Sequence, residues 1–146
     1  MTEARKFSIL YVEDSPADTE FVRTAFKKIA PDVELSVVDS GRAALAALND
    51  HAARATLPDI VLLDLKMPGM DGHEVLANIK QDARLRHVPV IVLTSSRLAE
   101  DIVRAYEVGA NCYLPKPDDA LGYQAVAEEL RRFWMETVIL PPGREP

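Results

Sequence analysis

Polar side chains directly follow four of the short apolar runs in this sequence. They are Glu13 and Asp14 after the first run, Asp64 after the third, Thr94 after the fourth and Lys116 shortly after the fifth. Three carboxylates held close together repel one another, and their pKa values rise unless a cation is present. This set of side chains is therefore typical of a site that binds a positively charged ion.

Magnesium suits these residue types, because it prefers oxygen ligands supplied by one or two carboxylates, waters and a phosphate. The set contains no His and no Cys that would favour a softer metal. With the ion held by Asp14 and Asp64, a carboxylate could attack an electrophilic phosphoryl group and form an acyl phosphate. The Lys116 ammonium and the Thr94 hydroxyl would then meet the developing negative oxygens.

Five short apolar runs, separated by helical patterns, must position these side chains. The expected strands are Phe7–Val12, Glu34–Val38, Ile60–Leu63, Val88–Leu93 and Cys112–Leu114. The first helix is expected to begin at Pro16, after a Ser15 cap, and to end before Pro31. The other expected helices cover Gly41–Asn49 with an open end as far as Thr56, the segment around Val75–Ile79, Leu98 to a Gly109 cap, and Leu121 to about Val138.

Strands that alternate with helices pair in parallel, because a crossover of a dozen residues joins parallel neighbours. Runs such as Ile60–Leu63 and Val90–Leu93 are apolar at every position, as expected of strands that helices cover on both faces. The pattern therefore predicts an α/β, doubly wound fold. In such sheets ligands bind outside the carboxyl ends of the strands, which is where the polar side chains that follow the apolar runs lie.

The composition fits one domain in a reduced, aqueous compartment. The 146 residues include 17 Lys and Arg against 23 Asp and Glu, which gives a formal net charge of −6. This acidic balance argues against nucleic acid and anionic membranes as partners, since clustered basic residues bind both. No apolar run reaches the ~18 residues of a membrane span, and the lone Cys112 excludes an internal disulfide. We expect a cytoplasmic protein with one domain over residues 1–140, a short tail over 141–146 and no output domain.

The order of these motifs resembles the receiver domain of two-component response regulators. The matching segments are Glu13-Asp14, Asp64-Leu65-Lys66-Met67-Pro68-Gly69-Met70-Asp71-Gly72, Thr94-Ser95 and Lys116-Pro117, and the resemblance covers about Phe7 to Trp134. It implies a flavodoxin-like (βα)5 sandwich with a five-stranded parallel sheet in the order 2-1-3-4-5. It also implies a Mg²⁺-dependent phosphoacceptor that takes a phosphoryl group from a sensor histidine kinase and loses it slowly by itself. Such a protein acts by switching its binding surface, and not as an enzyme on outside substrates.

The resemblance also assigns roles to single residues. It implies Asp64 as the phosphoacceptor, Glu13, Asp14, Asp64 and the Lys66 backbone carbonyl as metal ligands, Thr94 and Lys116 as phosphoryl contacts, and Thr94 and Tyr113 as the switch. A cis Lys116–Pro117 bond is implied as well. The ending Phe133-Trp134 and Leu140-Pro141-Pro142 further resembles stand-alone receivers that accompany bacterial phytochrome kinases, which implies a phytochrome-type partner.

Two functions of other classes use a related sheet. A Mg²⁺-dependent phosphatase with an Asp nucleophile generally carries a second acid two residues later, where this chain has Lys66. A flavin-binding electron carrier needs a phosphate cradle rich in Ser, Thr and Gly after the first strand, where Glu13 and Asp14 would repel the phosphate. The residues thus favour the signalling module over both alternatives.

Other reactive side chains have simpler interpretations. Ser15 is expected to cap a helix, because no His nearby in the sequence could act as its base. The side chain of Lys66 is expected in solvent, and Cys112 is expected to be an inert, buried thiol. His51, His73 and His87 have no metal-binding spacing, so we expect them on the surface.

The end of the last predicted helix carries more apolar residues than one helical face can bury. They are Phe133, Trp134, Met135, Val138, Ile139 and Leu140. Either this segment folds back on its own domain, or it forms an interface, where aromatic residues are enriched. We expect a homodimer through this helix and the Val138–Pro142 tail, tuned by phosphorylation of Asp64, because a twofold axis lets one surface serve both partners. The final residues from Leu140 to Pro146 are expected to form a short loose end.

Overall fold

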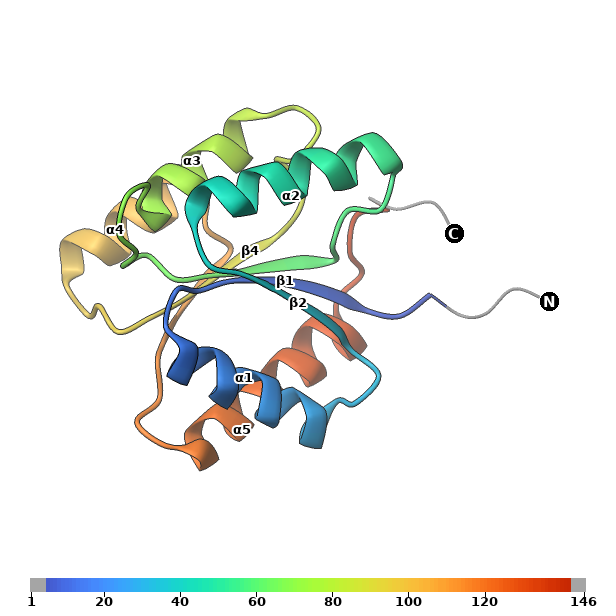
Figure 1. Ribbon diagram of the computed structural model, residues 1–146, viewed down its shortest axis with the longest axis vertical. Helices are drawn as coiled ribbons and strands as arrows, with labels where there is room; N and C mark the ends of the chain where they lie inside the picture. Colours follow the sequence, from blue (N-terminus) through green and yellow to red (C-terminus); the bar gives the residue numbers. More distant parts are fainter. Residues whose placement is uncertain (1–4, 143–146) are drawn as a thin grey trace.

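A five-stranded parallel sheet forms the centre of the molecule (Figure 1). The structure is a computed structural model, and it describes residues 5–142. The strands are β1 (Ser8–Val12), β2 (Glu34–Val38), β3 (Ile60–Leu63), β4 (Val90–Thr94) and β5 (Cys112–Pro115). Their order is β2-β1-β3-β4-β5, which confirms the predicted fold class. Because Val12 of β1 lies opposite Leu63 of β3, the residues that follow these two strands emerge side by side.

Helices cover both faces of the sheet (Figure 1). On one face α1 (Pro16–Ile29) packs against α5 (Ala120–Leu130). The other face carries α2 (Gly41–Arg54), α3 (Gly72–Gln81) and α4 (Ala99–Val108). Successive residues of a strand point to opposite faces, so Val61 joins the core under α2 and α3, whereas Leu62 joins the core under α1 and α5. Burial on both faces explains why β3 is apolar at every position.

The helices begin where the sequence places hydrogen-bonding caps. Ser15 Oγ accepts a bond from the backbone N–H of Asp18, and Pro16 occupies the first turn of α1, as predicted. Asp71 and Asp119 cap α3 and α5 in the same way. These caps fix the points at which the chain turns from a strand end into a helix, and so they fix the loops that carry the polar residues.

One predicted boundary was wrong by two residues, and another was settled by the structure. The strand β4 begins at Val90 and not at Val88, because the Val88 N–H closes a turn on the Leu85 carbonyl and Pro89 has no N–H to donate. The second helix, whose end the pattern places between Asn49 and Thr56, ends at Arg54 because Ala55 takes up a left-handed conformation with φ 56°.

The end of the last helix differs from the regular helix that was predicted to about Val138. The α-helix ends at Leu130, and residues Arg131–Thr137 form a wider π-helical segment that is closed by a bond from the Val138 N–H to the Phe133 carbonyl. Trp134 and Met135 pack against the core under α1 and α5, whereas Phe133 is 50% exposed. Leu140 also packs against this core, so the prediction that Leu140 belongs to a loose end was wrong. Residues 143–146 lie outside the described part of the chain.

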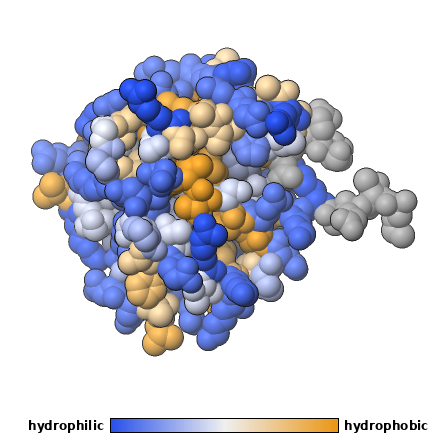
Figure 2. All heavy atoms as spheres, in the orientation of Figure 1, coloured by the Kyte–Doolittle hydropathy of each residue, from blue (hydrophilic) through white to orange (hydrophobic). Residues whose placement is uncertain are grey.

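The surface seen in Figure 2 is largely hydrophilic, with a band of apolar atoms near its middle where the edge strand β2 runs. Within residues 5–142, no helix combines the length and the apolar character that a bilayer crossing needs.

Gly72 lets the start of α3 approach the end of β3. Its N–H donates to the Leu65 carbonyl at 3.0 Å. A Cβ atom at this position would lie 2.4 Å from the Asp64 carbonyl oxygen and 2.4 Å from Leu65 Cα. Both are backbone atoms, which cannot rotate away, so any side chain here would displace the backbone of Asp64.

We therefore expect Gly72→Ala to lower the free energy of unfolding by about 3 kcal/mol, the upper end of typical overpacking costs. The measurement is urea unfolding followed by circular dichroism. Gly69→Ala is the matched control, because a Cβ there meets nothing within 4 Å and only its φ of +79° is unfavourable. That control should lose about 1 kcal/mol, and equal losses in the two variants would contradict the steric argument.

Candidate functional site

The ends of β1 and β3 bring three carboxylates together. Carboxylate oxygens of Glu13, Asp14 and Asp64 all lie within 4.8 Å of one another. The backbone ladder sets this arrangement, because the Asp64 N–H donates to the Val12 carbonyl at 3.1 Å and the Glu13 N–H donates to the Val38 carbonyl at 3.0 Å. Glu13 and Asp64 are buried, whereas Asp14 is exposed. The cluster thus opens to solvent on the side of Asp14.

Lys116 places one ammonium among these carboxylates. Its Nζ lies 2.7 Å from Glu13 Oε1 and 3.3 Å from Asp64 Oδ2. Its backbone N–H donates to the Thr94 carbonyl at 2.9 Å, which continues the pairing of β4 and β5. The predicted cis Lys116–Pro117 bond was wrong, since the described chain contains only trans peptide bonds. The long side chain reaches the carboxylates from the trans geometry, so a cis bond is not needed to direct it.

The charges of this site are strongly coupled. Burial raises the pKa of Glu13 to about 7, with Asp64 adding to the rise and the hydrogen bond from Lys116 opposing it. Burial lowers the pKa of Lys116, but its hydrogen bonds to Asp18 and Glu13 outweigh that effect and raise the pKa overall. Two neutral donors also hold Glu13, namely the Tyr11 hydroxyl at 3.0 Å and the Ser15 N–H at 3.2 Å.

The donor set fits a hard divalent cation. Three carboxylates converge within 4.8 Å, and the charge of Asp64 adds to the burial that raises the pKa of Glu13, so a further cation would be stabilised here. Oxygen donors of this kind suit an ion such as Mg²⁺. The Lys66 N–H donates to Asp64 Oδ1 at 3.3 Å, which places the Lys66 backbone beside the cluster. No contact tests the role of its carbonyl as a ligand, and that role stays a prediction.

The predicted switch residues lie on the neighbouring strands. Thr94 is fully buried at the end of β4. The Tyr113 hydroxyl, from β5, donates to the Ser96 carbonyl at 2.9 Å, so it is tied to the loop that follows Thr94. The Ser96 hydroxyl donates to Asp101 of α4, and hydrogen bonds from Ser96 and Lys66 hold the pKa of Asp101 at about 2.

The Lys66 side chain is exposed as predicted, whereas His73 differs from its predicted place. The Lys66 side chain is 54% exposed, and its ammonium also forms an ion pair with Asp101 at 3.0 Å. His73 was expected on the surface, but only 4% of it is exposed, and its Nε2 lies 3.4 Å from Asp101 Oδ1. A signal for its burial was present, because His73 precedes the buried Leu76 and Ile79 at helical spacing. His87 is exposed as expected, and burial raises the pKa of the half-buried Cys112, in keeping with an inert thiol.

Sequence reasoning missed Asp18 as a member of the site. Asp18 lies in the first turn of α1, three residues after the Ser15 cap, a spacing that indicates only the start of a helix. In the structure Asp18 Oδ2 lies 2.7 Å from Lys116 Nζ, and the Tyr123 hydroxyl donates to Asp18 Oδ1 at 3.3 Å. Only the packing of α5 on α1 brings Tyr123 to this point, and no local pattern in the sequence reports such packing.

Comparisons with known proteins agree with this geometry. The model of the response regulator receiver domain family matches residues 9–127. Response regulator Rcp1 from Synechocystis sp. is 41% identical over 135 residues, which cover 91% of this chain and 92% of that protein. The phosphorylated cyanobacterial phytochrome response regulator RcpA has a similar structure, with a TM-score of 0.86, 36% identity, and coverage of 94% of this chain and 99% of that chain.

The Mn²⁺-bound form of Rcp1 is similar as well, with a TM-score of 0.83, 40% identity, and coverage of 94% of this chain and 99% of that chain. The match extends over both the sheet and the loops at its carboxyl edge, where the carboxylates and Lys116 meet. From its sequence, its fold and its site, this chain belongs to the response regulator receiver domain family.

Proposed function

We propose that Asp64 accepts a phosphoryl group from a sensor histidine kinase, and that this modification switches a binding surface of the protein. One observation carries the proposal: the buried Asp64 carboxylate lies between an acidic pair and the Lys116 ammonium, which is 3.3 Å away. A nucleophile, a set of metal ligands and a cation for the phosphoryl oxygens are thus present at one sheet edge.

The transfer moves the phosphoryl group from a phosphohistidine of the kinase to Asp64. A bond forms between an Asp64 carboxylate oxygen and phosphorus, and the bond from phosphorus to the imidazole nitrogen breaks, with its electron pair left on nitrogen. Lys116 offsets the negative charge of the phosphoryl oxygens, and the Thr94 hydroxyl donates to one of them. A bound Mg²⁺ supplies further positive charge here, and Glu13, Asp14, Asp64 and the Lys66 carbonyl would hold it.

The phosphoryl group would act on the loop between β4 and α4. It adds about −1.5 to −2 charge at neutral pH, which attracts the Thr94 hydroxyl. Because the Ser96 carbonyl accepts the Tyr113 hydroxyl bond, a shift of this loop would also move Tyr113. The output of the protein would therefore be a change in what its surface binds.

Hydrolysis of outside phosphate esters is the second candidate, and the site does not favour it. A phosphatase of related fold would need an acid at the position of Lys66 to protonate its leaving group. The Lys66 side chain instead forms an ion pair with Asp101 at 3.0 Å. We therefore propose that the protein is a phosphoacceptor and not an enzyme that acts on outside substrates.

Several features support the remaining parts of the proposal. The likeness to the cyanobacterial phytochrome response regulator RcpA supports a phytochrome-type kinase as the partner. Both apolar cores of residues 5–142 pack on one sheet, which supports a single receiver unit over residues 1–140. The net charge of −6 speaks against nucleic acid and anionic membranes as partners. The single cysteine, Cys112, fits action in a reduced cytoplasm.

We also propose that the end of α5 and the following tail pair with a second copy of the chain. The segment folds back in part, because Trp134 and Leu140 pack against the core. Phe133 remains 50% exposed and Ile139 99% exposed, and Val138 and Leu140, the neighbours of Ile139 in the chain, line an open groove. That groove is lined by Arg5, Phe7, Asp59, Trp134, Met135, Val138, Leu140, Pro141 and Pro142. An isologous pairing would cover these apolar side chains in both copies.

Asp64→Asn should abolish Mg²⁺-dependent phosphorylation by a small acyl phosphate, because the amide is a poor nucleophile. Intact-mass spectrometry would measure the labile gain of one phosphoryl group. Asp71→Asn serves as the control, since that side chain caps α3 and lies in the same loop. A labile phosphoryl group on the Asp64→Asn protein would rule out the assignment.

Asp14→Asn should weaken Mg²⁺ binding by about tenfold or more, the loss typical when a metal site loses an important group. Asp14 is exposed, so the change should leave the fold intact. Calorimetric titration of the unphosphorylated protein with Mg²⁺ gives the affinity, and circular dichroism checks the fold. An unchanged affinity would remove Asp14 from the ligand set.

Ile139→Asp should raise the dissociation constant of a dimer by about tenfold or more, as for an important interface residue. Sedimentation over a concentration series measures this constant. Leu121→Asp provides the control, because Leu121 is 73% exposed at the other end of α5. A monomeric wild-type protein, or equal dimers in all three proteins, would refute the role of the tail.

A further inference from the structure

Asp18 holds the same ammonium that the proposed phosphotransfer needs. Lys116 Nζ lies 2.7 Å from Asp18 Oδ2 but 3.3 Å from Asp64 Oδ2. Only 11% of the Lys116 side chain and 27% of the Asp18 side chain are exposed, so water screens this ion pair weakly. In the unphosphorylated protein, Lys116 is therefore shared among Glu13, Asp64 and Asp18, and of these three carboxylates only Asp18 lies outside the metal cluster.

Two further bonds fix the place of Asp18. Its backbone N–H donates to the Ser15 cap, which sets its position in the first turn of α1. Its Oδ1 accepts the Tyr123 hydroxyl at 3.3 Å, while its Oδ2 faces Lys116. The two carboxylate oxygens thus bridge α5 and the loop after β5.

Tyr123 is itself held firmly between two helices. Only 3% of this residue is exposed, and its ring stacks on that of Phe21 with 5.0 Å between the centroids. Burial, together with the charge of Asp18, raises the pKa of Tyr123 to about 12, so its hydroxyl remains a donor at neutral pH. Asp18 therefore has a fixed partner that keeps its carboxylate beside Lys116.

We infer that Asp18 is a positioning residue that competes with Asp64 and its phosphoryl group for the Lys116 ammonium. The inference rests on the proposed phosphorylation of Asp64. A phosphoryl group carries about −1.5 to −2 charge, more than a carboxylate, so it draws Lys116 away from Asp18. Asp18 opposes that shift through its ion pair with Lys116, and its negative charge also disfavours the approach of the anionic phosphodonor.

Removal of the charge of Asp18 should therefore speed up phosphorylation. We expect Asp18→Asn to raise the initial rate of phosphorylation by a small acyl phosphate by roughly fivefold or more, because roughly fivefold corresponds to two unit charges about 4 Å apart in bulk water and this pair is screened less than that. The amide has the shape of the carboxylate and can still accept the Tyr123 hydroxyl. The rate is measured by intact-mass spectrometry at fixed Mg²⁺ concentration.

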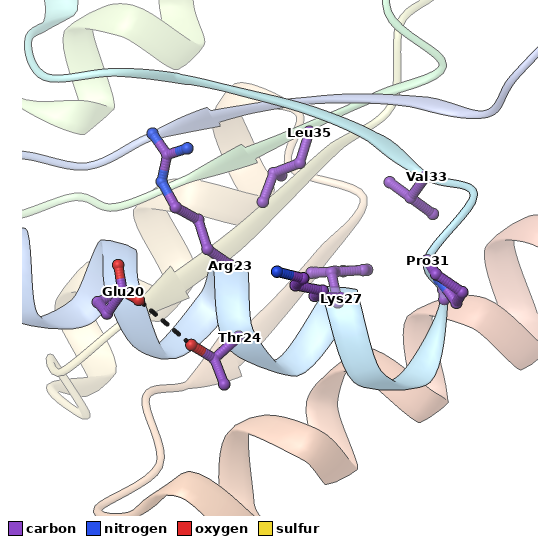
Figure 3. A pocket seen from close by; sticks show the side chains of 9 residues that line it. Glu20, Arg23, Thr24, Lys27, Pro31, Val33 and Leu35 are labelled. Atoms are coloured by element: carbon purple, nitrogen blue, oxygen red, sulfur yellow. Dashed lines mark hydrogen bonds between the residues drawn. The ribbon is translucent and has the colours of Figure 1, made fainter.

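Two variants distinguish the effect of the Asp18 charge on the rate from the effects of side-chain shape and of the net charge of the protein. Asp18→Glu keeps the charge but lengthens the side chain, so its rate should lie nearer to that of the wild type than the rate of Asp18→Asn does. Glu20→Gln removes one negative charge from the same helix, where the Glu20 side chain bonds only to Thr24 among the hydrogen bonds drawn in Figure 3. Its rate should equal that of the wild type.

The outcomes distinguish this inference from the proposed function. A rate of Asp18→Asn that equals or falls below that of the wild type would overturn the role of Asp18 and leave Asp64 as the phosphoacceptor. An equal rise in Glu20→Gln would assign the effect to net charge and would also overturn it. If neither the wild type nor Asp18→Asn gains a phosphoryl group, the proposed function itself fails.

Discussion

Repulsion among three carboxylates is the constraint on which the arrangement of this molecule depends. Glu13, Asp14 and Asp64 converge within 4.8 Å, and two of them are buried. Like charges at this distance are unfavourable in a protein interior unless a cation or a proton offsets them. The structure supplies one ammonium, from Lys116, whose hydrogen bond lowers the pKa of Glu13, but burial, with a contribution from the charge of Asp64, still raises that pKa overall. The donor set of this site therefore suits a divalent cation.

The sheet order determines how this constraint is met. Because β1 and β3 are neighbours, Glu13 and Asp64 emerge side by side. β5 is separated from β3 by β4, so only a long side chain can bridge the distance, and Lys116 does so. The absence of a side chain at Gly72 lets α3 start directly against the Asp64 backbone. Each of these features helps to place a charged group at the carboxyl edge of the sheet, and each depends on the order β2-β1-β3-β4-β5.

The site is connected to both layers of helices. On one side, Lys116 contacts Asp18, whose other oxygen accepts the Tyr123 hydroxyl from α5. On the other side, Lys66 and Ser96 meet at Asp101 of α4, and Tyr113 bonds to the backbone of Ser96. A change of charge at Asp64 can therefore reach α1 and α5 through Lys116, and it can reach α4 and β5 through the loops. This connection gives a physical basis for a signal that starts at one carboxylate and ends at a surface.

The sequence by itself determined the elements, the fold class and the residues at the carboxyl edge, because hydrophobic periodicity and caps are local properties of the chain. Tertiary structure decided what each side chain touches. The pairing of Asp18 with Lys116, the burial of His73 against Asp101 and the ion pair of Lys66 all join elements that are distant in the sequence. The π-helical turn after Leu130 also arises where the chain end packs on the core. Local patterns report which face of an element is apolar, but the partner of a charged side chain depends on which elements pack together, and only the folded chain sets that.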